Sequence, residues 1–398
     1  MSYAEDGAVV PEQRDQPHLA PSLVVGLGAS AGGVRVLQQF FRHPEVAEIG
    51  AAYVAVLHLS PEHESRLAEV LAAVTSIPVT RVTETVRVER DHVYVISPNT
   101  SLRMADGLLT VSANLRGEER RAPVDIFFRT LGDTHGPRAV CIVLSGTGPD
   151  GSNGIKRIKE QGGIVIAQDP AECEHADMPR NAIATGFVDH VLPVNEMPPR
   201  LLALVRQLGP LSHEETPPVL EGTPEPLHEI LTLVRLRTGH DFSHYKTATV
   251  LRRIERRRLL HDLPDLPAYA RFVREQAQEV QSLQRELLVS VTHFFRDPDA
   301  FAALRRTVIP RMFHSRPWHD QVRVWVAGCA TGEEAYSMAI ILAEAVDRLS
   351  DSPTAQVFAT DLDERAIAEA REGFYTDADV ADVSPERLHR FFTRASGG

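Results

Sequence analysis

Short apolar runs that alternate with helical patterns constrain the fold of the first half of this 398-residue chain. Between residues 22 and 206 these runs are "SLVVGLG", "AAYVAVLHLS", "HVYVISP", "RAVCIVLSG" and "GGIVIAQD". Runs of this length, separated by stretches long enough for a helix, are typical of parallel strands joined by crossover helices. The sequence therefore predicts an α/β domain with a largely parallel sheet over residues 22–206.

The remainder of the chain divides into three segments. Residues 207–226 are rich in Pro, Glu and Thr and have no hydrophobic periodicity, which predicts a linker. Residues 227–311 carry apolar residues at helical spacing and are predicted to form a small helical subdomain. Strand-and-helix alternation resumes with "QVRVWVAG" and "AQVFATD", which predicts the start of a Rossmann-like domain over residues 312–398.

Composition excludes several classes of protein. The formal net charge of −12 argues against a general nucleic-acid binder. No apolar run reaches the length of about 18 residues that a membrane span needs, and the N-terminus lacks the pattern of a signal peptide. A cytoplasmic protein is therefore expected. Neither a disulfide framework nor a metal site is predicted, because no CxxC pair exists among Cys141, Cys173 and Cys329.

The segment "VVGLGASAGGV" crowds glycines around Ser30, where the first predicted strand gives way to a helix. Gly28, Ser30 and Gly32 fit the G-x-S-x-G pattern of a nucleophile elbow, in which glycines relieve crowding on a tight turn. A P-loop is excluded because no GK[ST] follows. The looser match to G-x-G-x-x-G leaves a dinucleotide-binding fold open at this point.

A serine nucleophile needs a base and an orienting acid, and α/β sheets place such groups at the carboxyl ends of strands. His58 and Asp150 both follow predicted strands. His63, in the "PEHES" loop beyond the strand end, is a second candidate for the base. Each candidate also has a purely structural interpretation, since His58 could be a capping residue and Asp150 part of a Pro-Asp-Gly turn.

Several motifs together are more specific. In chain order, "GASAGG", "LHLSPEHES", "ISPNTSLRM", "RAPVDIFFRTL", "VLSGTGPDGSNG" and "MPRNAIATGFVD" resemble the catalytic domain of the chemotaxis protein-glutamate methylesterase family over roughly residues 22–206. The resemblance implies Ser30 as nucleophile, His58 as general base and Asp150 as its orienter. It also implies oxyanion donors from the backbone N–H groups of Ala31 and Thr147, and no cofactor for the esterase.

The implied reaction is hydrolysis of glutamyl methyl esters on a receptor helix, or deamidation of glutamine there, by a serine carboxylesterase mechanism. The order Ser…His…Asp differs from the Ser…Asp…His order of a generic lipase. Many members carry an N-terminal phosphorylatable receiver domain, for which the residues before Ser30 are too few. Control of the esterase is therefore expected to come from another part of the assembly.

Basic residues gather on or beside one predicted helix in the second half of the chain. They are Lys246, Arg252, Arg253, Arg256, Arg257 and Arg258. Considered alone they suit a solvated face, and no aromatic stacking pattern accompanies them to favour RNA or DNA binding.

A second glycine-containing turn, with Gly328 and Gly332, links a predicted strand to a predicted helix. It carries Glu333 and Glu334 but no lysine, which suits the ribose and sulfonium of S-adenosylmethionine better than the phosphates of ATP. Asp361 ends the next predicted strand, where an acidic side chain can bind ribose hydroxyls.

These features, with "VTHFFRD", "REGFY" and "SPERLHRFF", resemble the chemotaxis receptor-glutamate methyltransferase family from about residue 227 to the end. The resemblance implies docking of the basic helix on acidic receptor helices and cofactor contacts from Thr292, Arg296, Glu333 and Asp361. Ser290 stands where some members have asparagine. Because only two strands of the methyltransferase sheet precede Gly398, we expect a fragment of a longer fusion, without methyl transfer or tight S-adenosylmethionine binding.

Two functions of different classes follow. The leading hypothesis is a methylesterase fused to a partial methyltransferase that acts on methyl-accepting receptor helices, with no nucleic acid and no membrane insertion. The alternative is a non-catalytic regulatory scaffold of a sensory signalling complex. The Ser30, His58 and Asp150 set favours the enzyme for the first half, whereas the incomplete second half favours the scaffold there. The receptor and the oligomeric state are not determined by the sequence.

Overall fold

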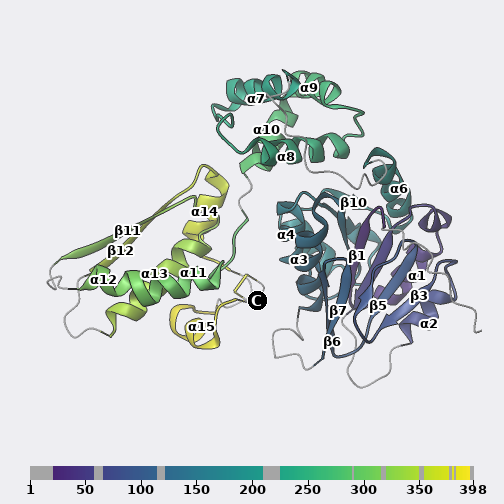
Figure 1. Cartoon of the computed structure of the whole chain (residues 1–398), viewed down its shortest axis with the longest axis horizontal. Coiled ribbons are helices and arrows are strands. Elements are labelled where there is room, and N and C mark those ends of the chain that lie inside the picture. The colour runs from purple at the N-terminus through teal and green to yellow at the C-terminus, as the bar shows by residue number, and fades with distance from the viewer. Residues whose placement is uncertain are drawn as a thin grey trace, which may run out of the picture.

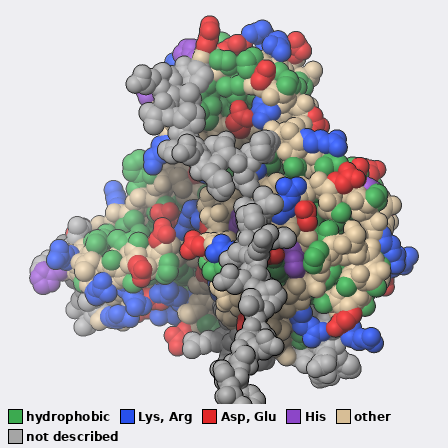
Figure 2. All heavy atoms as spheres, turned by 45° about the vertical axis from the view of Figure 1, so that its right-hand side comes forward, with side chains coloured by type: hydrophobic (Ala, Val, Ile, Leu, Met, Phe, Trp, Pro, Cys, Tyr) green, Lys and Arg blue, Asp and Glu red, His purple; other side chains and the backbone are tan. Residues whose placement is uncertain are grey.

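The structure is a computed structural model that describes residues 21–57, 66–113, 122–208, 225–288, 291–314, 320–348, 354–375, 379–380 and 382–394. Its elements form three groups in Figure 1: an α/β unit in purple to teal, a helical unit above it, and a second, smaller α/β unit in green to yellow. Acidic and basic side chains are interspersed over the face seen in Figure 2. No helix within the described ranges is long and apolar enough to cross a membrane.

Seven parallel strands form the sheet of the first unit, in the order β10-β9-β8-β1-β2-β5-β3. Their bounds are β1 (Val24–Ala29), β2 (Ala52–Leu57), β3 (Val79–Val82), β5 (His92–Ile96), β8 (Ala139–Val143), β9 (Ile164–Gln168) and β10 (His190–Leu192). The central strand β1 has β8 on one side and β2 on the other, with Ala29 opposite Leu57. Ser30 thus follows the strand at which the sheet order changes direction, the usual place for a site in an open α/β sheet.

Helices cover both faces of this sheet. One face packs against α1 (Gly33–Phe41), α2 (Leu67–Ala72) and α6 (Met197–Leu208). The other packs against α3 (Pro123–His135), α4 (Gly154–Glu160) and α5 (Asp177–Ala184). Gly28 lets α3 approach closely, since a Cβ at this position would lie 2.3 Å from Val124 Cγ1. This approach brings the N-terminus of α3 to the end of β1 that precedes Ser30.

A small antiparallel sheet supports α3 and was not anticipated from the sequence. It consists of β4 (Val86–Arg87), β6 (Thr100–Ala105) and β7 (Leu108–Ala113), in the order β4-β7-β6. Leu102, Met104 and Leu109 from this sheet are fully buried in the same core as the helix. A strand of two residues such as β4 carries too little periodicity to be recognised.

The helical unit comprises α7 (Glu225–Thr238), α8 (Thr247–Leu260), α9 (Leu266–Glu275) and α10 (Ala277–Leu288), which share their own core. The last unit pairs β11 (Gln321–Ala327) with β12 (Thr354–Thr360) in parallel. Its helices are α11 (Pro298–Ala303), α12 (Ile309–Phe313), α13 (Glu333–Val346), α14 (Glu364–Glu372) and α15 (Pro385–Phe391). The predicted fold class, a parallel-sheet α/β domain followed by a helical subdomain and the start of a Rossmann-like domain, is confirmed.

Candidate functional site

Ser30 lies on the tight turn between β1 and α1, half-buried. Its N–H donates to the carbonyl oxygen of Ser145 at 3.1 Å, and its own carbonyl oxygen accepts from Gly33 N–H at 3.0 Å. Gly32, the N-cap of α1, has φ 78°, and a Cβ there would lie 2.9 Å from Ser145 Oγ. Both the left-handed conformation and the lack of space therefore require glycine at this position.

The loop that follows β8 is packed directly against this turn. A Cβ on Gly146 would lie 2.9 Å from both Cβ and N of Ser30, so only glycine lets the two loops approach so closely. Ser145 Oγ lies 3.1 Å from the carbonyl oxygen of Ala31 and 3.2 Å from that of His175. It also accepts from His175 N–H at 3.1 Å. Three loops are thereby tied together around Ser30.

Asp150, at the end of the same loop, is 9% exposed and turned toward the N-terminus of α3. Its Oδ2 accepts from Val124 N–H at 3.1 Å and its Oδ1 accepts from Asp125 N–H at 3.0 Å. A carboxylate in this position satisfies two of the otherwise unpaired donors of a helix N-terminus. Because Val124 also packs against Gly28, α3 brings Asp150 to the end of β1 that leads to Ser30.

The surroundings of Asp150 destabilise its charge. Burial, and next the negative charge of Asp125, raise the pKa of Asp150 above its ordinary value, against the opposing effect of the backbone N–H groups. A hydrogen-bond donor beside the carboxylate of Asp150 therefore stabilises the ionised form strongly, because little water competes for this carboxylate. An imidazole N–H is a donor of this kind.

The two expected oxyanion donors are the backbone N–H groups of Ala31 and Thr147. Ala31 follows Ser30 directly, and Thr147 follows Gly146 at an exposed position. Neither backbone N–H donates a hydrogen bond to another residue of the described ranges. Their role as oxyanion donors stays a prediction.

The expected base, His58, and the second candidate, His63, lie outside the described residues. The preceding residue of the chain, Leu57, is the last of β2 and is paired with Ala29 of β1. His58 as the base stays a prediction.

In the third unit, two of the expected cofactor residues lie at the carboxyl ends of the strands. Asp361 accepts from Ala330 N–H through Oδ2 at 2.8 Å and from Asp363 N–H through Oδ1 at 2.9 Å. Glu333, buried in the first turn of α13, accepts from Thr331 Oγ1 at 2.6 Å, and burial raises its pKa. Asp361 thus fixes the glycine-containing loop that precedes α13.

The other two expected cofactor residues belong to the segment before α11. Arg296 donates to the carbonyl oxygen of Val291 at 3.1 Å and pairs with Glu160 of α4 at 3.3 Å. Among its contacts within the described ranges, none is with Glu333 or Asp361. Thr292 lies in the same segment, half-buried. Arg296 is therefore held toward the first α/β unit in this structure.

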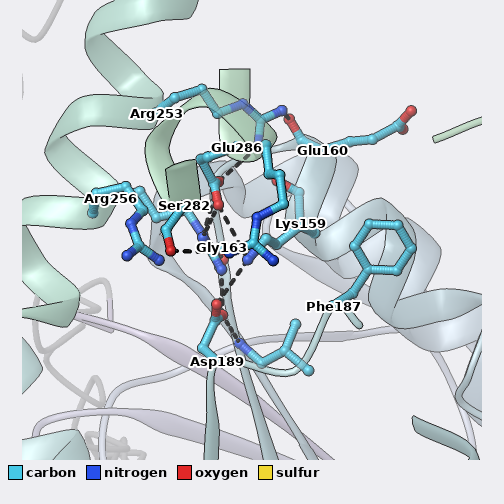
Figure 3. Close-up of polar contacts among 12 residues, drawn as sticks. Lys159, Glu160, Gly163, Phe187, Asp189, Arg253, Arg256, Ser282 and Glu286 are labelled. Atoms are coloured by element: carbon cyan, nitrogen blue, oxygen red, sulfur yellow. Dashed lines mark hydrogen bonds and ion pairs between the residues drawn. The ribbon is translucent and has the colours of Figure 1, made fainter. Parts of the chain in front are cut away.

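The basic helix is α8, and two of its arginines are buried. Arg256 is 2% exposed and Arg253 is 3% exposed, because α8 packs on the first α/β unit (Figure 3). Arg253 donates to the carbonyl oxygens of Lys159 and Glu160. The expectations of a solvated face and of an open receptor-docking face are both wrong for these two residues. Helical periodicity shows which charges share a face, but not what that face meets.

Arg256 is the centre of a buried ion network between the two units. It pairs with Asp189 of the first unit and with Glu286 of α10, where Nη1 lies 2.9 Å from the carboxylate. Its Nε donates to the carbonyl oxygen of Gly163 at 2.8 Å, and Lys159 pairs with the same two carboxylates. Burial alone would raise the pKa of Asp189, but the charges of Arg256 and Lys159 outweigh it and lower that pKa.

Replacing Arg256 with methionine is expected to lower the free energy of unfolding by about 3 kcal/mol, because two buried carboxylates each lose one of their compensating charges. Urea denaturation followed by circular dichroism measures this loss. Arg285→Met is the matched control, since Arg285 is exposed on α10 and its replacement should change stability by less than about 0.5 kcal/mol. Equal stability of the two variants would contradict a buried network in solution.

Comparisons with known proteins agree along the chain. Residues 25–201 match the family described as CheB methylesterase. Residues 225–288 match the CheR methyltransferase all-alpha domain, and residues 290–398 match the CheR methyltransferase SAM binding domain. The solved CheB methylesterase catalytic domain of Thermotoga maritima is 26% identical, covers 47% of this chain and all of its own, and gives a TM-score of 0.42.

Three relatives match different shares of the chain. A 104.1 kDa protein of Rhodobacter capsulatus is 37% identical over 83% of this chain, which spans 37% of that protein. A protein-glutamate methylesterase/protein-glutamine glutaminase of Hydrogenovibrio crunogenus is 30% identical over 50% of this chain and 54% of its own length. A Leptospira interrogans protein provisionally given the same name is 30% identical over 43% of this chain and 89% of its own length.

Proposed function

The chain belongs to the CheB methylesterase family through residues 25–201 and continues into the domains of a CheR methyltransferase, and from this we propose that its first domain hydrolyses glutamyl methyl esters of chemoreceptor proteins. The same site would deamidate receptor glutamines, as the paired names of its relatives suggest. The observation that carries the proposal is the packing of Gly146 against Ser30, with Asp150 buried at the end of the same loop.

In the proposed reaction, Ser30 Oγ attacks the ester carbonyl carbon while His58 accepts the hydroxyl proton. His58 then gives this proton to the departing methoxide, so methanol leaves and an acyl-enzyme remains. Water, with His58 again as the base, releases the carboxylate. The N–H groups of Ala31 and Thr147 stabilise the oxyanion, and Asp150 orients the imidazole.

The test is the release of methanol from a methyl-esterified chemoreceptor fragment by the 398-residue chain. Turnover should stop after treatment with a serine-directed sulfonyl fluoride, because the nucleophile is then blocked. A folded chain that releases no methanol above the uncatalysed rate would contradict the proposal. That result would favour the alternative, a non-catalytic regulatory scaffold, for which the buried network between the first two units is the supporting observation.

Asp150→Asn is expected to reduce methanol release on the order of a thousandfold while the chain stays folded, by analogy with other triads. The amide keeps an oxygen for the N-terminus of α3 but stabilises neither the correct tautomer nor the imidazolium. Initial rates and thermal unfolding measure the two effects. Asp106→Asn, at the exposed turn between β6 and β7, is the control with unchanged rate. Wild-type turnover in a folded Asp150→Asn chain would make "GPDG" only a turn.

For the methyltransferase part we propose that Glu333 and Asp361 form the ribose end of an S-adenosylmethionine site, to which Thr292 and Arg296 of the segment before α11 add contacts. The residues present fit the group at this end, because Asp361 keeps lone pairs free for hydroxyls after its two backbone contacts. The opposite end is open, since β12 is mostly exposed and a groove of about 770 Å³ runs beside α13 and α14.

The open groove predicts that this 398-residue chain binds S-adenosylhomocysteine too weakly to detect at micromolar concentrations, because affinity depends on burial in a preformed site. Neither should it transfer a labelled methyl group to a receptor fragment. Titration calorimetry measures the first and scintillation counting the second. A dissociation constant in the micromolar range, or any transfer, would show that the strands β11 and β12 suffice.

A further inference from the structure

Asp125, in the first turn of α3, is a buried acidic residue to which the proposed reaction assigns no role. Its side chain is 2% exposed. Oδ1 accepts from the backbone N–H groups of Asn153 at 2.9 Å and Gly154 at 2.6 Å. A backbone hydrogen bond from Gly151 also reaches this carboxylate. Asp125 therefore holds the turn of residues 151–154 that follows Asp150 directly.

The contact is reciprocal. The carboxylate of Asp150 accepts from the N-terminus of α3, through Val124 and Asp125. The carboxylate of Asp125 accepts from the N-terminus of α4, which begins at Gly154. Each helix thus supplies donors to an acid associated with the other, and a shift of either carboxylate costs hydrogen bonds at the helix end that it caps.

The packing at this point leaves little freedom. A Cβ on Gly154 would lie 2.6 Å from Phe128 Cβ and 3.0 Å from Asp125 Cα, so α3 and α4 touch through backbone here. Interiors packed to this density transmit the loss of a support to the neighbouring residue. The position of Asp150 is therefore set on one side by α3 and on the other by the turn that Asp125 holds.

We propose that Asp125 is a positioning residue for Asp150, which holds the orienting acid in place through the 151–154 turn. The negative charge of Asp125 also acts on Asp150. The inference rests on the proposed esterase reaction. Among the described residues, Arg129 of α3 is the charged group with the largest effect on Asp125, and backbone N–H groups of Gly151, Asn153 and Gly154 contribute as well. For Asp150 the acting charge is Asp125.

Two substitutions separate the two parts of the proposal. Asp125→Ala removes the support, and we expect the kcat for methanol release to fall about tenfold or more, with KM within about twofold. Asp125→Asn keeps an oxygen for Asn153 and Gly154, so kcat should stay within a few-fold. Asp133, exposed on the same helix, provides the matched controls Asp133→Ala and Asp133→Asn, which should leave kcat and its pH profile unchanged.

The pH profile of Asp125→Asn should move in a defined direction. The active form has no proton on either His58 or Asp150, and removing a neighbouring negative charge weakens proton binding to this pair. The acid limb of kcat/KM should therefore move to lower pH, by about half a unit or more. An acid limb that stays in place, or a folded Asp125→Ala chain with the wild-type kcat, would overturn the proposal.

A second measurement does not depend on turnover. In carbon-13 NMR of the carboxyl groups, the titration of Asp150 should move to lower pH in Asp125→Asn and stay in place in Asp133→Asn. If the wild-type chain releases no methanol, the proposed reaction fails, but this titration still decides whether Asp125 acts on Asp150. An unchanged Asp150 titration would refute the inference in either case.

Discussion

A chain that carries Ser30→Ala is expected to release methanol from a methyl-esterified receptor fragment only slightly faster than the uncatalysed reaction. The rate of methanol release should fall on the order of 10⁵-fold or more. The reason is chemical, because alanine offers no oxygen to form the acyl-enzyme and water would have to attack directly. The fold should persist, since only the backbone of Ser30 is held by Ser145 and Gly33. Initial rates and circular dichroism measure the two properties.

The matched control for this loss is Ser112→Ala, which removes a hydroxyl from β7 of the small antiparallel sheet. Its turnover should equal that of the wild-type chain. If Ser30→Ala retains a substantial part of the activity, Ser30 is not the nucleophile. The glycines around it would then serve only the close approach of the loops after β1 and β8.

His58→Ala is expected to reduce methanol release by a comparable factor, because without a base the hydroxyl of Ser30 stays protonated at neutral pH. His63→Ala should retain most of the activity. The two histidines are separated by the local argument that only His58 follows a strand end directly, where β2 lies beside β1. Initial rates at several pH values, with both variants in parallel, provide the measurement.

Added imidazole provides a further test of His58 as the base. It should restore part of the turnover of His58→Ala, because a free base can enter the space left by the side chain, and it should leave Ser30→Ala inactive. Equal losses in His58→Ala and His63→Ala would leave no basis for choosing between them. Full activity in His58→Ala would contradict the Ser30, His58 and Asp150 set.

Ser30 and Asp125 differ in how far the sequence predicted their roles. Ser30 was recognisable because glycines and a serine at a strand end form a local pattern, and the structure places this serine on the β1–α1 turn. Asp125 lies in the quoted motif "RAPVDIFF", but its spacing to Asn153 and Gly154 gives no sign of a contact. An acidic residue in the first turn of a helix ordinarily supports its own helix, whereas this one supports the next.

The expected cofactor residues show the same limit. Asp361 and Glu333 follow from local signals, a strand end and the first turn of a helix, and both lie by the loop before α13. Arg296 was expected at the cofactor, yet its ion pair is with Glu160 of another unit. A pairing across 136 positions of the chain depends on how the units dock, which no local pattern records.

The sequence by itself determined the parallel α/β class, the helical unit and the turn that carries Ser30, because these depend on periodicity and steric needs over a few neighbouring residues. Only the tertiary structure decided where the arginines of α8 point. The helical spacing of Arg253 and Arg256 is the same for a solvent-exposed surface, a docking face or a buried interface. The difference lies in the carbonyl oxygen of Lys159 and the carboxylate of Asp189, which another part of the chain supplies. The same holds for Asp125 and Asp150, whose mutual support arises only when α3 and α4 pack side by side through backbone.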